Sequence, residues 1–177
     1  VFAEGGSNQW GIDTGKIVIG GSNSGAYVAL AAGNLNDTSE LTNIKFVGVG
    51  NIPFIDPAIM GDFEGFNGPQ TNNNYPGFSS DFQAVFALGG SVGDTSWVQA
   101  GEPPVIAFHG VNETATPYNT NVVTTTTGQP VVEVSGSGDF MPVVDAFGNN
   151  AGFTPNNFPA GPANRNGLGQ TTRVIDG

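Results

Sequence analysis

The stretch that decides the fold runs from Ile17 to Leu30 and reads Ile-Val-Ile-Gly-Gly-Ser-Asn-Ser-Gly-Ala-Tyr-Val-Ala-Leu. Its first residues are apolar and β-branched, which favours a strand, and the small residues that follow favour a sharp turn. The alanine-rich residues from Gly25 to Gly33 then favour a buried helix that ends at the second glycine. The sequence therefore predicts a strand over 16–20, a turn and a helix over 25–33.

The turn in this stretch has a specific spacing of glycines. Gly21 lies two residues before position 23 and Gly25 lies two residues after it. This is the spacing of the Gly-x-Ser-x-Gly nucleophile elbow, in which a strained turn lifts one side chain above the sheet. Position 23 is Asn23, whose neutral carboxamide offers no oxygen or sulfur nucleophile that a base can activate. The sequence thus predicts the scaffold of an acyl-transfer site without its central atom.

Two further apolar runs, 81–90 and 104–110, predict strands. Both are apolar throughout, which is typical of strands in a parallel sheet that is covered by helices on both faces. We therefore expect an α/β fold. Shorter elements are also expected: the frayed end of a helix over 1–11, a short strand or extended segment over 43–51, an exposed β-prone arm over 124–127 and 130–134, and a short helix over 139–147.

The length of 177 residues suits one domain with a sizeable core. We expect residues 1–177 to form a single domain or fragment. With 28 glycines and 12 prolines, much of the chain should be turn and loop. Aromatic residues and prolines without a sustained period predict an ordered insertion or lid over 53–80. The residues over 149–177, dominated by Gly, Asn and Pro, predict an irregular tail.

The charge and composition exclude several classes of partner and site. Fifteen acidic and four basic residues give a formal charge of −11, which opposes attraction to nucleic acid or anionic lipid. We therefore expect neither partner, and no apolar run approaches the ~20 residues of a membrane span. The absence of cysteine excludes disulfides, zinc thiolate sites and a cysteine nucleophile. Such acidity suits an extracellular or saline setting, although solubility through self-repulsion explains it equally well.

Three stretches together resemble a known family. They are Trp10–Asp13 (Trp-Gly-Ile-Asp) with the run from Lys16 to Ser22, then Gly89–Trp97 (Gly-Gly-Ser-Val-Gly-Asp-Thr-Ser-Trp), then Gly101–Gly110 (Gly-Glu-Pro-Pro-Val-Ile-Ala-Phe-His-Gly). In this order and spacing they are similar to the secreted carboxylesterase and lipase-like α/β-hydrolases of Bacteroidetes-type bacteria. The resemblance implies an incomplete α/β-hydrolase-like parallel sheet with helices on both faces, a long insertion and a loop-rich carboxyl end.

The resemblance also implies roles for individual residues. Asn23 falls on the nucleophile position and Glu113 on the acid position, while Gly21 and Gly25 shape the elbow around a bound substrate. Ser22 and Ser24, one step on either side of the apex, are alternative nucleophiles, but a shift of one residue on so tight a turn redirects the side chain. The Ser24 backbone N–H points into an oxyanion pocket in such an elbow.

The histidine of the family's triad has no counterpart at the expected place. The family order is serine, acid, histidine, yet no histidine follows Glu113. The single histidine, His109, matches a family position at a strand end, where a structural role is expected. Asp56, Asp62 and Glu64 offer the clustered oxygen ligands that calcium favours, but their spacing matches no EF-hand, and ordinary loop acids are the preferred interpretation. We expect no metal and no cofactor.

These observations favour a non-catalytic hydrolase-fold module of a secreted or cell-surface protein, derived from a carboxylesterase. One alternative is a fragment of an active carboxylic ester hydrolase whose other catalytic residues lie outside this chain. Another is an extracellular structural or adhesive protein, because an incomplete sheet exposes apolar surface that self-association can cover. The expected partners are an ester or other small molecule, or further copies of the chain.

Overall fold

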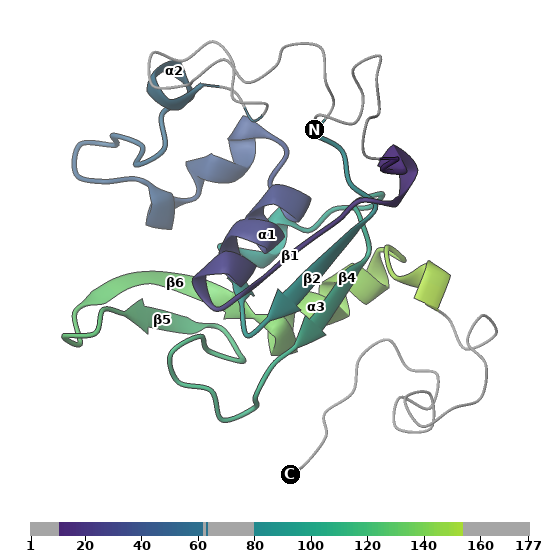
Figure 1. The fold of residues 1–177 in the computed structure, drawn as a ribbon. Coiled ribbons are helices and arrows are strands. Elements are labelled where there is room, and N and C mark those ends of the chain that lie inside the picture. Colours follow the sequence, from purple (N-terminus) through teal and green to yellow (C-terminus); the bar gives the residue numbers. More distant parts are fainter. Residues whose placement is uncertain (1–10, 62, 64–79, 154–177) are drawn as a thin grey trace. The chain divides into compact units, whose positions relative to one another are not determined.

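A computed structural model describes residues 11–61, 63 and 80–153, and Figure 1 shows their arrangement into helices and strands. The chain divides into two compact units. The described residues of the first unit are 11–17, 36–61, 63 and 80–83, and those of the second are 18–35 and 84–153. The elbow and the predicted sheet strands lie in the second unit.

The second unit contains a parallel sheet of three strands in the order β1-β2-β4. The strands are β1 (Val18–Ser22), β2 (Ala84–Leu88) and β4 (Val105–Phe108), which confirms those predicted over 16–20, 81–90 and 104–110. Ser22 pairs with Leu88, and Leu88 pairs with Phe108. The three strands therefore end in one row, and the residues that follow them share the carboxyl edge of the sheet.

The same unit contains an antiparallel sheet in the order β3-β6-β5. Its strands are β3 (Ser91–Val92), β5 (Asn121–Thr124) and β6 (Pro130–Gly136). The predicted strand over 130–134 is confirmed, whereas 124–127 mostly forms the hairpin turn. Gly128 closes this turn with a positive φ of 80°, and the Thr125 hydroxyl accepts a hydrogen bond from the Gln129 N–H at 3.0 Å. This side-chain bond explains why a β-prone threonine run becomes a turn.

The helix α1 (Ser24–Asn34) follows β1 and confirms the helix predicted over 25–33. A Cβ atom on Gly21 would lie 2.2 Å from the Gly25 carbonyl carbon, so glycine is what lets the start of α1 approach the strand. The helix α3 (Ser137–Ala146) confirms the prediction over 139–147 and buries Phe140, Met141 and Val144. Short 3₁₀ turns complete the unit: η4 (Thr95–Trp97) and η5 (Ala151–Phe153).

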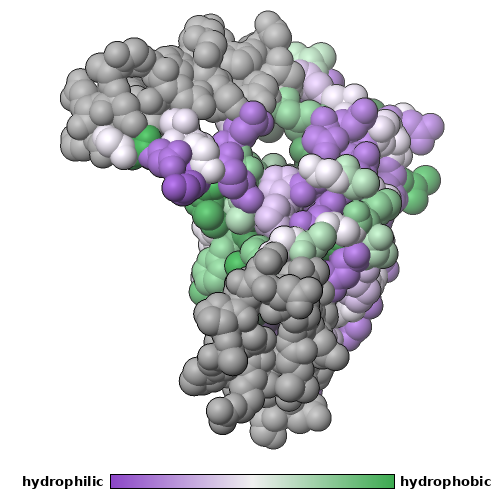
Figure 2. Space-filling model, turned by 90° about the vertical axis from the view of Figure 1, so that its right-hand side faces the viewer, coloured by the Kyte–Doolittle hydropathy of each residue, from purple (hydrophilic) through white to green (hydrophobic). Residues whose placement is uncertain are grey.

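The two faces of the parallel sheet differ in burial. Val85, Ala87 and Val105 are buried, whereas Ile106 is 40% exposed and Phe108 is 61% exposed. Apolar side chains also reach the surface elsewhere, and Figure 2 shows hydrophobic and hydrophilic residues interspersed on one face of the molecule. The mixed α/β class is confirmed. Within the described residues, however, only one face of β2 and β4 is buried. The expectation that helices cover both faces of the sheet is therefore wrong around Phe108, which is exposed.

The first unit consists of short turns: η1 (Thr14–Lys16), η2 (Thr38–Thr42), η3 (Ile44–Phe46) and the single helical turn α2 (Pro57–Met60). An Asp or Asn side chain caps each of them, as at Asn43, which accepts a hydrogen bond from the Lys45 N–H at 3.3 Å. The prediction of a strand or extended segment over 43–51 is therefore wrong for its first half. In its second half, Val47 forms an isolated antiparallel β-bridge with Pro53.

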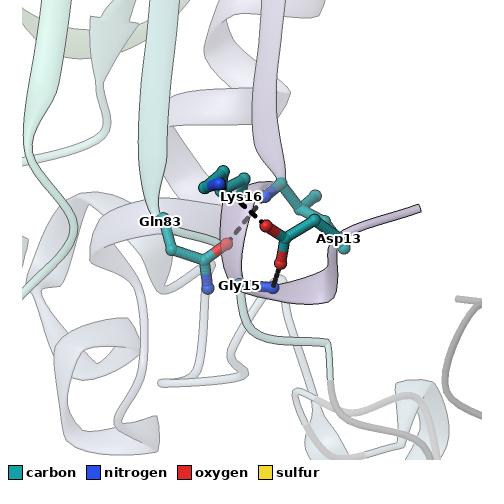
Figure 3. A network of polar contacts seen from close by, with 5 residues as sticks. Asp13, Gly15, Lys16 and Gln83 are labelled. Carbon is teal, nitrogen blue, oxygen red and sulfur yellow. Dashed lines mark hydrogen bonds and ion pairs between the residues drawn. The ribbon is translucent and has the colours of Figure 1, made fainter. Parts of the chain in front are cut away.

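The entry to β1 is held by a polar network in the first unit (Figure 3). Asp13 accepts a hydrogen bond from the Gly15 N–H at 3.1 Å and pairs with the Lys16 ammonium at 3.0 Å. Ile17 and Gln83 exchange two bonds, from the Ile17 N–H to the Gln83 side chain at 2.7 Å and from the Gln83 N–H to the Ile17 carbonyl at 2.8 Å. The ion pair is exposed and contributes little, so the pairing of Ile17 with Gln83 is the main constraint.

Several expectations lie largely outside the described residues. Of the insertion expected over 53–80, only 53–61, 63 and 80 are described, and they include α2. Of the tail expected over 149–177, only 149–153 is described, and it contains η5. The helix end expected over 1–11 is described only at Gly11. Across the part of the chain that is described, no helix has the length and apolar character needed to cross a membrane.

Candidate functional site

The turn between β1 and α1 has a strained backbone at its apex. Asn23 has φ 50° and ψ −116°, a conformation that non-glycine residues rarely adopt and that costs about 1–3 kcal/mol. The Asn23 N–H donates to the Leu88 carbonyl at 2.9 Å, and its carbonyl accepts from the Ala26 N–H at 2.9 Å. These bonds fix the turn to the neighbouring strand and to the helix. The exposed Asn23 side chain is therefore held at the tip of a sharp strand-to-helix bend.

The neighbours of the apex occupy different environments. Ser22 is the last residue of β1 and Ser24 is the first of α1, and both are exposed. The N–H groups of Ser24 and Gly25 belong to the first turn of α1, which has no intrahelical acceptors for them. The first turn of α1 carries no acidic residue. It can therefore receive a hydrogen-bond acceptor from a ligand without local charge repulsion.

Three residues form a row at the carboxyl edge of the parallel sheet. Asn23, Gly89 and His109 directly follow the paired strand ends Ser22, Leu88 and Phe108. The Gly89 N–H donates to the Phe108 carbonyl at 2.8 Å, which continues the pairing one step past β2. Ligands of open α/β sheets bind outside the carboxyl ends of the strands. This row is therefore the candidate site.

His109 has partners on both ring nitrogens. Its Nε2 lies 2.7 Å from the Thr116 carbonyl oxygen, and its Nδ1 lies 2.8 Å from the Ser137 hydroxyl. A carbonyl oxygen only accepts, so Nε2 carries the hydrogen and, in the neutral ring, Nδ1 accepts from Ser137. The Tyr118 ring packs edge-on against the imidazole with centroids 5.7 Å apart. His109 is thus oriented by partners from the chain after β4 and from α3.

Ser137, which the sequence analysis did not select, is the hydroxyl that the structure places against the histidine. It is the first residue of α3, and only 5% of its surface is exposed. Both flanking glycines permit the approach, since a Cβ on Gly136 would lie 2.0 Å from the Pro117 carbonyl oxygen and one on Gly138 would lie 2.6 Å from the Tyr118 ring. The glycine-serine-glycine run between a strand and a helix was the signal available in the sequence.

Glu113 does not act on His109 in this structure. The Glu113 carboxylate accepts hydrogen bonds from the Thr114 N–H at 3.1 Å and the Ala115 N–H at 3.0 Å. Because Thr116 and Ser137 engage the two ring nitrogens of His109, the carboxylate orients neither of them. The structure therefore brings Asn23 and His109 to one edge of the sheet but leaves Glu113 as an exposed turn residue.

The segment 116–120, which holds the Thr116 carbonyl, is fastened at several points. The Gly138 N–H donates to the Tyr118 carbonyl at 2.8 Å, and the Ser91 hydroxyl donates to the Pro117 carbonyl at 3.3 Å. Hydrogen bonding from Thr120, chiefly from its side chain, lowers the pKa of Asp139 against the opposing effect of burial. These bonds tie the segment to β3 and to the first turn of α3.

Burial changes the pKa of one further titratable group, Tyr27 of α1. Desolvation by burial raises the pKa of the Tyr27 phenol. Tyr27 therefore stays neutral at physiological pH and provides no negative charge near α1.

The first unit contains an apolar groove of about 670 Å³. Its lining contains no charged residue and none of the residues predicted as site residues: Thr38, Leu41, Thr42, Ile44, Val47, Asn51, Pro53, Ile55 and Pro57. Among the described residues no group of three or more His, Asp or Glu side chains is arranged to hold a metal. Asp56 caps α2 through the Ala58 N–H at 2.9 Å, and Asp62 and Glu64 lie outside the described residues.

Comparison of the chain with family models, with curated proteins and with solved structures found no match.

Proposed function

We propose that this chain is a non-catalytic, hydrolase-like module of a secreted or cell-surface protein, derived from a carboxylic ester hydrolase, whose elbow binds a ligand without cleaving it. The chemistry of the apex carries the proposal. The backbone of Asn23 adopts φ 50° and ψ −116° at a strand-to-helix bend, where a hydrolase needs a nucleophile. The carboxamide that stands there cannot attack an acyl carbon.

The surroundings of the apex support the same conclusion. The imidazole of His109 is occupied by Ser137 and by the Thr116 carbonyl, at 2.8 Å and 2.7 Å. A general base must be free to take a proton from the nucleophile that it activates, and with these partners neither ring nitrogen is free for a residue at the apex. The strain at Asn23 remains although the catalytic atom is missing, and strained backbone of this kind is concentrated at ligand clamps and active sites. We therefore assign the elbow a binding role.

The proposal is tested by ester hydrolysis with p-nitrophenyl butyrate. The chain is expected to release p-nitrophenolate at the spontaneous rate, and the variant Asn23→Ser tests whether the elbow alone can be reactivated. We expect no gain in this variant because no base is directed at the apex. Release above the spontaneous rate by the unaltered chain contradicts the proposal.

A second candidate function, ester hydrolysis, is favoured by one observation. The Ser137 hydroxyl donates to His109 Nδ1 at 2.8 Å, which is the ground-state arrangement of a serine and its general base. Against it stands the burial of Ser137, of which 5% is exposed, since an acyl substrate must reach the oxygen. Hydrolysis that disappears in Ser137→Ala but persists in Ser22→Ala and Ser24→Ala favours this candidate over the binding module.

A third candidate, self-association in an extracellular assembly, is favoured by the exposed apolar face of the parallel sheet. Ile106 and Phe108 lie on this face, and Phe86 packs edge-on against Phe108 with centroids 5.9 Å apart. Apolar side chains gathered on one face are a common feature of association surfaces. Light scattering after size exclusion distinguishes this candidate, because it requires an assembly that Phe108→Ser dissociates.

A further inference from the structure

The apolar groove of the first unit takes no part in the function proposed for the elbow. Its volume is about 670 Å³, and the described residues that line it fall within 38–57. Pockets that hold small molecules generally measure about 300–1,000 Å³ and are lined mainly by apolar side chains. The groove therefore has the size and the lining of a small-molecule site.

The aliphatic side chains of the groove range from a buried base to an exposed wall. Leu41 is 3% exposed, whereas Ile55 is 37% exposed and Ile44 is 84% exposed. A ligand that covers exposed apolar side chains in a concave site gains the free energy of removing them from water. Among the described residues no aromatic ring lines the groove, so a planar ligand finds no ring on which to stack. The lining therefore suits an aliphatic chain.

The polar groups of the lining lie at its exposed parts. Thr38, Thr42 and Asn51 are exposed and supply hydroxyl and amide groups. The Thr42 hydroxyl donates to the Ser39 carbonyl at 2.6 Å, which leaves the lone pairs of its oxygen for an outside donor. No charged residue is found in the described lining, so a charged ligand gains no ion pair there. A ligand with an aliphatic body and one neutral polar end matches both parts of the groove.

The charge around the groove disfavours an anionic ligand. Residues 36–61 carry three carboxylates and one ammonium group, that of Lys45. Hydrogen bonding from Ser39, chiefly from its backbone N–H, lowers the pKa of Asp37, so this carboxylate stays ionised at neutral pH. The whole chain has a formal charge of −11. The protein therefore repels a fatty carboxylate but not a neutral molecule with the same chain.

The turns that form the walls of the groove are fixed by their own hydrogen bonds. Asp37 and Glu40 form a capping box at η2, in which the Asp37 N–H donates to the Glu40 carboxylate at 2.9 Å. The bridge that carries Val47 is closed by a hydrogen bond from the Gly48 N–H to the Ile52 carbonyl at 2.7 Å. A site whose groups are already positioned loses less entropy when a ligand binds. The groove is therefore preorganised.

The size of the groove favours a small molecule over a second protein chain. Nine described residues line it, whereas each partner of a stable protein–protein interface contributes about 20–30 residues. Two copies of the chain would also bring together formal charges of −11 each, which repel one another.

We propose that the groove lined by residues 38–57 binds a neutral aliphatic molecule with one polar end, such as an alcohol or an acyl ester with a medium-length chain. The chain of the ligand covers Leu41, Ile44 and Ile55, and its polar end stays at the exposed threonine and asparagine side chains. This inference goes beyond the binding function proposed for the elbow, because no residue of the elbow lines the groove.

The experiment compares 1-octanol with sodium octanoate at pH 7 by NMR titration of the ¹⁵N-labelled 177-residue chain. Octanol is expected to shift the backbone signals of Leu41, Ile44 and Ile55 saturably. Octanoate has the same chain but a carboxylate, and it is expected to bind about fivefold more weakly at low salt, with a ratio that narrows as salt screens the repulsion. No saturable shifts with octanol, or equal or tighter binding of octanoate at low salt, overturn the inference.

Matched variants locate the binding. Ile44→Ser and Ile55→Ser remove exposed walls of the groove, and each is expected to weaken octanol binding about three- to tenfold. Val49→Ser and Ile52→Ser are the controls, because these side chains are 97% and 67% exposed but do not line the groove. If Ile55→Ser does not fold, Ile44→Ser decides alone. Octanol affinity that is unchanged in Ile44→Ser, or lowered equally in the controls, contradicts the inference.

The same titration distinguishes other occupants and the elbow. Groove signals that shift with chain concentration in the absence of octanol indicate a second copy in the groove and overturn the inference. Octanol shifts confined to Ser24 and Gly89 place the ligand at the elbow, which contradicts the inference and leaves the proposed function standing. The proposed function is contradicted by release of p-nitrophenolate from p-nitrophenyl butyrate, a readout that does not depend on octanol.

Discussion

The Ser137 hydroxyl lies 2.8 Å from Nδ1 of His109, although 28 residues separate them in the chain. The bond links the first turn of α3 to the segment that follows β4. It combines a serine and a histidine, the two residue types of a hydrolytic site, but at a position remote from the elbow in sequence and in a buried setting. We expect its main effect to be on stability.

Replacement of Ser137 is expected to weaken the fold. Ser137→Ala leaves His109 Nδ1 without its donor and should lower the free energy of unfolding by about 1–3 kcal/mol. Urea denaturation followed by circular dichroism measures this loss. A fluorophosphonate probe followed by mass spectrometry is expected to leave Ser137 unlabelled, and an adduct on Ser137 contradicts the structural role.

Removal of the unpartnered Thr116 hydroxyl is expected to have the opposite effect. Thr116→Val replaces a buried polar group that has no hydrogen bond in the described structure, and it should raise the free energy of unfolding by about 1 kcal/mol. Thr120→Val is the comparison, because the Thr120 hydroxyl bonds to Ser135 at 3.2 Å. Urea denaturation of both variants provides the test, and a loss of stability in Thr116→Val contradicts the absence of a partner.

The two glycines of the elbow are expected to respond differently to alanine. A Cβ on Gly21 would meet the Gly25 backbone at 2.2 Å, so Gly21→Ala should destabilise the fold by about 3 kcal/mol or more. Position 25 has no atom within 4 Å of its Cβ site and lies in a helix, so Gly25→Ala should stabilise by about 0.5–1 kcal/mol. Thermal unfolding of the pair measures both effects, and equal effects contradict the close approach of α1 to β1.

Asp139 should make stability depend on pH in the acidic range. Its pKa is lowered in the folded chain, chiefly by the Thr120 side chain, so its contribution is fully present above the unfolded-state pKa of about 4. The contribution is lost as the pH falls through the lower folded-state pKa. The difference in the free energy of unfolding between the chain and Asp139→Asn should therefore shrink between pH 7 and pH 3. A difference that stays constant over this range contradicts the assignment.

The elements that could be predicted are those with local causes. The strand, turn and helix around Asn23 follow from a β-branched run, two glycines and an alanine-rich segment, all within 14 residues. The apolar runs of β2 and β4 are equally local. The prediction of a strand or extended segment over 43–51 was wrong in its first half. The alternation of apolar residues there competes with a side-chain cap from Asn43 and with a positive φ of 58° at Asn51.

The site could be predicted only in part, because it depends on contacts between distant segments. Asn23 at the apex follows from glycine spacing. The bond of His109 to Ser137 depends on the close approach of Gly136 and Gly138 to residues 117 and 118, which no local pattern specifies. Glu113 was assigned to the acid position by the resemblance, and in the structure two backbone N–H groups of its own turn donate to its carboxylate. The row of Asn23, Gly89 and His109 likewise appears only when the three strand ends are aligned.

We propose that the Asn23 carboxamide makes the elbow a binding site and not a catalytic one. The most direct measurement is the rate of p-nitrophenolate release from p-nitrophenyl butyrate by the 177-residue chain, with buffer alone as the reference. We expect the two rates to be equal. A faster release that persists in Asn23→Ala and disappears in Ser137→Ala would contradict it and would assign catalysis to the pair of Ser137 and His109.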